Sequence, residues 1–254
     1  MNSFLQFDPL TLMLAVTVAL GAGVVKGMVG FAMPMIMISV LGGFLRPDVA
    51  LAALIFPTLV TNGMQALRQG PRAAWQSIVR FRVFLLCGLV MMLLSAQMVA
   101  VVPQRILLAL IGGPVALFAV TQLLGRNLTL PKGANPGIEA GIGAFAGFIG
   151  GFSGVWGPPT VAYLTALGTE KREQMRVQGV IYGLGAVALT GAHISSGVIS
   201  TVTAPLSALL VLPAVLGMWM GGQIQDRIDQ AAFRKATLLV LLVAGLNLVR
   251  RALL

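Results

Sequence analysis

Lys26 is the residue best placed to do chemistry, because it is the only charged residue in the apolar run Pro9–Leu45. A lysine inside a membrane-spanning segment is costly unless it is paired or hydrated, so it marks a functional site by default. The alternative is that the long side chain extends to the membrane surface, as lysines near helix ends do. Lys26 is therefore a candidate substrate-binding residue, with this structural role as the alternative.

The distribution of acidic residues indicates which substrate Lys26 would bind. All seven lie at the edges of apolar runs or between them: Asp8, Asp48, Glu139, Glu170, Glu173, Asp226 and Asp229. No carboxylate lies within a run to hold Na⁺, carry a proton or neutralise an organic cation. An anion, in contrast, can be bound by a lysine and by backbone N–H groups, so the sequence predicts an anion as substrate.

Two interruptions of apolar runs could supply those N–H groups. Pro34 follows Gly30, and Pro158 and Pro159 follow the glycine-rich stretch Gly150–Gly157. A proline at the first position of a helix leaves the other first-turn N–H groups free, and such an end carries about half a positive charge. The residues predicted to line an anion site at the two breaks are Gly30, Phe31, Ala32, Met33 and Pro34, with Gly151, Ser153, Gly154 and Trp156.

The glycines of these stretches have an alternative explanation. Glycines at 21, 23, 27 and 30 recur 120 residues later, at 141, 143, 147 and 150. Small residues at such spacing also permit close packing of membrane helices. Gly23, Gly27, Gly143 and Gly147 fit this packing role well, whereas the residues just before the prolines fit the site better.

A polar stripe follows Pro57. Thr58, Thr61, Asn62 and Gln65 have the spacing that places them on one helix face. The stripe could line an aqueous path and donate to oxyanions, or it could bond neighbouring helices at about 0.6–2 kcal/mol per bond. We favour lining, and Gln178 and Tyr182 form a thinner counterpart in the second half.

The remaining reactive residues do not form an enzyme site. His193 is the single histidine and Cys87 the single cysteine, so the sequence contains neither a metal-ligand cluster nor a cysteine pair. No base lies near a serine, and no phosphate-binding loop is recognisable. The sequence predicts neither catalysis, nor a metal, nor a cofactor. His193 is either a packing residue or a proton relay, and Trp75 is predicted to be an interfacial anchor.

Composition places these residues in a membrane protein. The chain is 57% hydrophobic and only 9% charged, and its mean hydropathy is +0.94, whereas soluble domains carry roughly 25% charged residues. The net charge of +10 comes from basic residues clustered between apolar runs, as in orientation signals and lipid contacts. These features predict an all-α polytopic protein in contact with lipid and argue against nucleic-acid binding.

Loop charge predicts two repeats of opposite orientation. The predicted organisation is a first repeat over residues 1–125, a cytoplasmic linker over 126–137 and a second repeat over 138–254. Each repeat would have about five helical segments, with a broken or re-entrant helix at its start. Four basic or charged loops would be cytoplasmic: Arg68–Arg82, Arg126–Gly137, Glu170–Arg176 and Asp226–Lys235. Arg250 and Arg251 violate the positive-inside rule in this arrangement.

The motifs resemble the TauE/SafE group of sulfite exporter-like anion permeases over nearly the whole chain. They read GFAMP and FPTLVTNGMQALRQG in the first half and GFIGGFSGVWGPPTVAYLTALG in the second. The matching positions are Pro34, Pro57, Asn62, Gln65, Gly150, Gly154, Pro158 and Tyr163. Departures occur at Phe31-Ala32, where many members have further glycines, and at Trp156, where a smaller residue is frequent. The family is commonly described with about eight spans, against the ten that loop charge favours.

The resemblance implies a multi-pass secondary carrier of the bacterial inner membrane. It would move sulfite, sulfoacetate or a related organosulfonate or carboxylate, mostly outward. We expect Lys26 and the two helix starts to bind the anion, and Thr58, Asn62, Gln65 and Ser153 to orient it. An anion channel, an uptake permease and a non-transport membrane protein are the alternatives. The expected partners are the anion and the bilayer. Whether the chain forms a homo-oligomer is left open.

Overall fold

The computed structural model describes residues 8–97, 104–126, 130, 135–153, 157–195 and 197–253, which form eleven helices connected by turns. The first six are α1 (Pro9–Val29), α2 (Met33–Leu41), α3 (Pro47–Leu67), α4 (Pro71–Arg80), α5 (Arg82–Gln97) and α6 (Gln104–Leu123). The other five are α7 (Pro136–Ser153), α8 (Gly157–Ala166), α9 (Lys171–Ser195), α10 (Ala204–Arg227) and α11 (Gln230–Leu253). The predicted all-α class is confirmed.

The chain forms two compact units, each built from two stretches of sequence. Unit 1 comprises Met1–Ala74 and Met175–Asp229, and unit 2 comprises Trp75–Gln174 and Gln230–Leu254. Each unit therefore combines helices from both predicted repeats. The division into repeats concerns how the two halves of the sequence are related, and it stays a prediction.

Five described helices are long and apolar enough to cross a membrane: α1, α3, α9, α10 and α11. The pair α4 and α5 would be a sixth candidate, but the two helices are bent by 73° at their junction. The chain is therefore a multi-pass membrane protein, with five or six candidate spans among the residues that the structure describes.

Three segments expected as loops are largely helical, and one of them, Asp226–Lys235, contains the end of α10 and the start of α11. The basic stretch Arg68–Arg82 contains α4, and the charged stretch Glu170–Arg176 contains the first turns of α9. A proline begins α4 and a lysine begins α9, so charge alone does not mark a helix end. The last two residues of the predicted linker, 136 and 137, belong to α7, which begins at Pro136.

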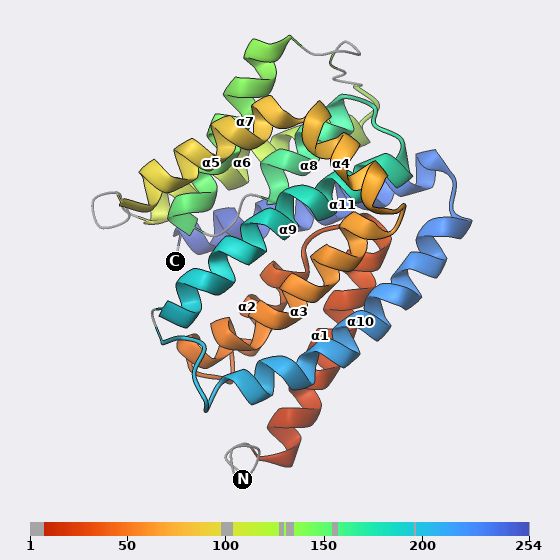
Figure 1. The fold of residues 1–254 in the computed structure, drawn as a ribbon. Helices are drawn as coiled ribbons and strands as arrows, with labels where there is room; N and C mark the ends of the chain where they lie inside the picture. Colours follow the sequence, from red (N-terminus) through yellow and green to blue (C-terminus); the bar gives the residue numbers. More distant parts are fainter. Residues whose placement is uncertain are drawn as a thin grey trace. The chain divides into compact units, whose positions relative to one another are not determined.

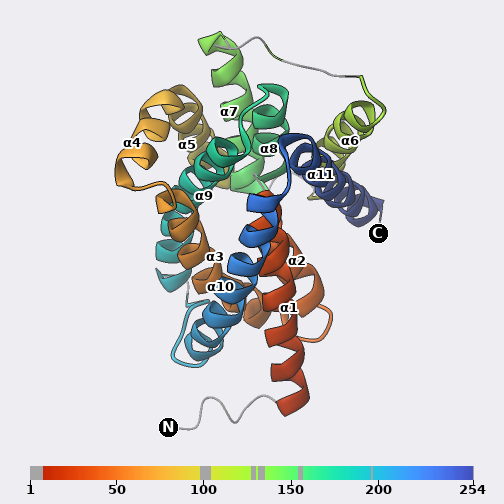
Figure 2. The ribbon, with the colours of Figure 1, turned by 90° about the vertical axis from the view of Figure 1, so that its right-hand side faces the viewer.

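Close packing of α1 against α10 dominates unit 1, and Figures 1 and 2 show the two helices side by side. A methyl group placed on Gly27 would lie 2.8 Å from the backbone nitrogen of Gly222. One placed on Gly23 would lie 3.1 Å from the backbone nitrogen of Met218. Such contacts require glycine, so the packing role of Gly23 and Gly27 is confirmed.

Unit 2 contains a similar pair, α5 against α7 (Figure 1). A methyl group on Gly147 would lie 2.6 Å from the backbone of Gly88, and one on Gly143 would lie 2.6 Å from the carbonyl oxygen of Phe84. The packing role of these two glycines is confirmed as well. In the same unit α6 packs against α11, and α8 contacts α6, α7 and α11.

Two short helices, α2 and α8, follow long helices. In unit 1, α2 packs against α1 and α3, and its residues Met33, Met37 and Leu41 are fully buried in a core that also includes Leu210 of α10. In unit 2, α8 begins four residues after the end of α7 at Ser153. The observed break between α1 and α2 agrees with the predicted broken helix, and Lys26 lies in the last turn before it.

Candidate functional site

The break between α1 and α2 has an unusual backbone. Gly30 ends α1 with φ +88°, and its N–H donates to the carbonyl oxygen of Lys26 at 2.7 Å. Ala32 precedes α2 with φ +75° and is the only described non-glycine residue with a positive φ. A methyl group on Gly30 would also lie 2.8 Å from the sulfur of Met175. The backbone conformation therefore favours glycine at position 30, whereas the side chains of Met175 and Gln178 could move to admit a methyl group.

Lys26 lies in the last turn of α1 with only 1% of its surface exposed. Its Nζ donates a hydrogen bond to Oδ1 of Asn62 on α3. The alternative that the side chain extends to the surface is wrong in this structure, because the ammonium group is buried between helices of unit 1.

The partner of Lys26 is a neutral amide, which leaves its charge uncompensated. The ion pairs found in the described part of the chain are Arg46–Asp48, Arg68–Asp226 and Arg80–Glu173, and none of them includes Lys26. A buried cation without a counter-ion is costly because it is removed from water. Binding an anion beside Lys26 would offset that cost, so the arrangement has the electrostatic character of an anion site.

The polar stripe of α3 is buried as a group, since Thr61, Asn62 and Gln65 are each almost fully covered. Thr61 donates to the carbonyl oxygen of Pro57 at 2.6 Å, within the turn that the proline introduces. The hydroxyl of Thr58 is buried without a hydrogen-bond partner. Thr61 therefore supports its own helix, while Asn62 and Thr58 keep polar groups that a ligand could use.

Gln65 joins three segments of unit 1. Its Nε2 donates to the carbonyl oxygen of Gly30 at 3.1 Å and to that of Met175, in α9, at 2.7 Å. Both hydrogens of the amide are thus directed at backbone carbonyls, whereas the sequence suggested donation to an oxyanion. In this conformation Gln65 fixes the break between α1 and α2 against α9.

The other predicted residues of unit 1 surround the same break. Phe31, Ala32 and Met33 are buried, and Pro34 is half-buried in the first turn of α2. Gln178 of α9 is fully buried with its Oε1 next to Gly30, and Tyr182 is buried one turn further along the helix. The structure therefore gathers the first-half candidates with the two α9 candidates inside unit 1. The α2 N-terminus carries no side-chain cap.

The second predicted break is only partly described. Gly151 and Ser153 lie in the last turn of α7, in unit 2, while Gly154 and Trp156 lie outside the described residues. Their predicted part in anion binding stays a prediction.

Gly21 and Gly141 differ from the packed glycines near them. Neither has an atom of another segment within 4 Å of the position that a methyl group would occupy, so neither shares the packing role.

Sequence reasoning missed the carbonyl of Met175 as a partner of Gln65. That contact joins residues 110 apart and involves a backbone atom, so no side-chain motif could signal it.

His193 is half-buried near the end of α9. Within the described ranges no group of three histidine, cysteine or acidic residues is suited to a metal ion.

A multi-pass helical protein with a broken helix and a buried, uncompensated cation beside the break belongs to the class of membrane transporters. The chain matches the sequence model of the family described as Sulfite exporter TauE/SafE over residues 15–248, and it therefore belongs to this family of transporters, which are not enzymes. No curated relative and no solved structure matches the chain.

Proposed function

We propose that this protein is a secondary transporter that exports a small sulfur-containing oxyanion, such as sulfite, sulfoacetate or a related organosulfonate, across a bacterial inner membrane. The observation that carries the proposal is the burial of Lys26 against the neutral amide of Asn62, without a carboxylate partner. Family membership supports a sulfur anion as the substrate.

The binding site would comprise Lys26, Asn62 and the N-terminal end of α2. Lys26 supplies the charge, the amide of Asn62 supplies a neutral donor, and the first turn of α2 supplies backbone N–H groups with a favourable dipole. Thr58 would complete the donor set from α3. Gln65 would act indirectly in this state, by fixing the backbone of Gly30.

Transport would follow alternating access between two related halves of opposite orientation. Support comes from the glycine pattern, since Gly23 and Gly27 pack on α10 while Gly143 and Gly147 pack on α5. The unpacked glycines correspond as well, because a methyl group on Gly21 or on Gly141 would have no atom of another segment within 4 Å. The buried state of Lys26 supports a conformation in which the anion site is closed.

Counterflow in proteoliposomes tests this function. Vesicles loaded with unlabelled sulfite or sulfoacetate should accelerate the entry of the labelled anion through the wild-type protein. Lys26→Gln should abolish this exchange, whereas Lys235→Gln, at an exposed lysine of α11, should leave it unchanged. Exchange that survives Lys26→Gln in a folded protein would overturn the assignment of the site.

The same assay separates the alternatives. A channel would conduct the anion without acceleration by unlabelled anion on the far side. An uptake permease would show exchange, and net flux under an imposed proton or sodium gradient then gives the direction. A non-transport protein would show no anion flux with any member of the substrate panel.

A further inference from the structure

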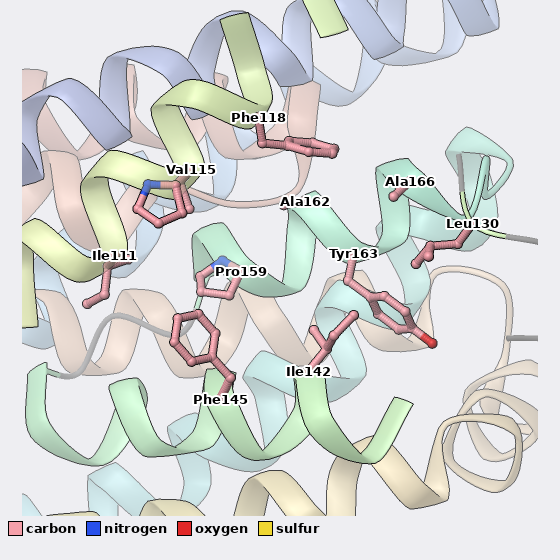
Figure 3. A pocket seen from close by; sticks show the side chains of 11 residues that line it. Ile111, Val115, Phe118, Leu130, Ile142, Phe145, Pro159, Ala162, Tyr163 and Ala166 are labelled. Atoms are coloured by element: carbon pink, nitrogen blue, oxygen red, sulfur yellow. The ribbon is translucent and has the colours of Figure 1, made fainter. Parts of the chain in front are cut away.

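Unit 2 contains a cavity of about 440 Å³ between α6, α7 and α8, shown in Figure 3. Its size falls in the range of about 300–1,000 Å³ that is typical of pockets for small ligands. Residues from all three helices point into it, with Phe118 from α6, Phe145 from α7 and Pro159 from α8 among them. Leu130 closes one end, where its N–H donates to the carbonyl oxygen of Ala166 at 2.8 Å.

The walls of this cavity do not suit the transported anion. Every described residue that lines it is apolar except Tyr163, and none is charged. A small oxyanion placed there would lose its hydration without gaining a cation or several donors, which is strongly unfavourable. The cavity therefore fits an apolar ligand, and its purpose is separate from that of the Lys26 site.

The cavity reaches the surface on a face that a membrane would cover. Two lining residues on adjacent helices, Pro114 of α6 and Phe145 of α7, are themselves exposed. Exposed large apolar residues, including Leu117 and Val120, continue this face along α6. In a membrane, acyl chains would be the solvent of such a surface, so the cavity would be accessible to lipid on the side of Pro114 and Phe145.

The cavity is also polarised along its length. Figure 3 shows the hydroxyl of Tyr163 at the end where Leu130 lies, while Phe145 and Pro159 lie toward the other end. The ring of Tyr163 is held by stacking on Phe84, with centroids 5.7 Å apart and planes inclined by 7°. A fixed hydroxyl at one end of an apolar space matches an amphiphile, which has an apolar chain and a polar group at one end.

We infer that this cavity binds one acyl chain of a membrane phospholipid, with the ester carbonyl of that chain accepting a hydrogen bond from Tyr163. The chain fills the space between α6, α7 and α8, which would otherwise be an empty cavity that costs stability. The bound lipid thereby supports the position of α8 in unit 2. The inference does not depend on the anion site.

Photo-labelling tests the inference. The protein is reconstituted with a phosphatidylglycerol that carries a diazirine on its acyl chain, and labelled peptides are mapped by mass spectrometry. Peptides that contain Phe118 and Phe145 should be labelled several-fold more than other lipid-facing peptides. Ala162→Phe, which places a ring in the cavity, should reduce this excess to the level of the other peptides. Ala109→Phe, at an exposed position of the same unit that does not line the cavity, should not.

A second variant tests the polar end. Tyr163→Phe keeps the stacked ring but removes the hydroxyl, so it should lower labelling by the ester lipid to the level of the matching ether lipid, which lacks the carbonyl. The inference is overturned if labelling of the cavity peptides is unaffected by Ala162→Phe. It is equally overturned if saturating sulfoacetate displaces the lipid, since the cavity would then belong to the substrate path.

Discussion

Asn62 accepts a hydrogen bond from the buried ammonium group of Lys26, and this bond joins the last turn of α1 to the C-terminal third of α3. The pairing of the lysine with a neutral amide leaves Lys26 without a negative partner among the described ion pairs. It also gives a direct way to alter the charge of the site without changing the shape of either side chain.

The substitution Asn62→Asp should close the site to anions. The new carboxylate would pair with Lys26 and supply the negative charge that we assign to the substrate. We expect anion affinity to fall by about tenfold or more, equivalent to at least about 1.4 kcal/mol, with thermal stability retained. Isothermal titration of the purified protein measures the affinity, and denaturation monitors the fold. Asn62→Ala serves as the control, because it removes the amide but keeps the free cation. Equal anion affinity in wild type and Asn62→Asp would contradict a site at Lys26.

Loss of the Gln65 side chain should loosen the break between α1 and α2. Gln65→Leu removes this donor from the carbonyls of Gly30 and Met175, and each lost hydrogen bond costs about 0.5–1.5 kcal/mol. Hydrogen–deuterium exchange should rise at residues 30–36, and chemical denaturation should report the lower stability. Gln76→Leu, on the exposed surface of α4, is the matched control. Unchanged exchange at the break would show that Gln65 does not position it.

Replacing Ala32 by glycine should stabilise the protein. The φ of +75° at Ala32 lies in the left-handed region, which costs a residue with a side chain about 1–2 kcal/mol. Part of the gain is offset because glycine increases the entropy of the unfolded chain by about 0.4–1 kcal/mol. The net expectation for Ala32→Gly is a small rise in melting temperature. Ala22→Gly, inside α1, should lower it instead. A lower melting temperature for both variants would indicate that Ala32 does not adopt this conformation in the membrane.

The glycine contacts give a paired stability test in both units. Gly27→Ala and Gly147→Ala each direct a methyl group at backbone atoms of a neighbouring helix, so each should cost about 1–3 kcal/mol. Gly21→Ala and Gly141→Ala meet no atom within 4 Å and should be neutral or stabilising, because alanine favours helix by about 1 kcal/mol. Unfolding in mild detergent measures all four. If the two open positions were as sensitive as the two packed ones, the pairing of α1 with α10 and of α5 with α7 would be wrong.

The sequence predicted those features that depend on a single segment. The isolated charge of Lys26, the break near Gly30 and the polar face of α3 are local patterns, so each could be located from residue type and spacing. The function of Gln65 could not, because its amide bonds to backbone carbonyls from two other segments. The compact units were also unpredictable, since they depend on which apolar helices pair and all of these helices have similar composition. The two repeats and the second half of the anion site remain predictions.

The contact between α1 and α10 has a consequence for how the protein is made. Eight described helices separate α1 from α10 in the sequence, so the glycine face of α1 lacks its partner until α10 has been synthesised. The pair α5 and α7, by contrast, is separated by one described helix, α6. Unit 1 therefore assembles late, and α1 must be held in the membrane by lipid or by the insertion machinery until α10 arrives.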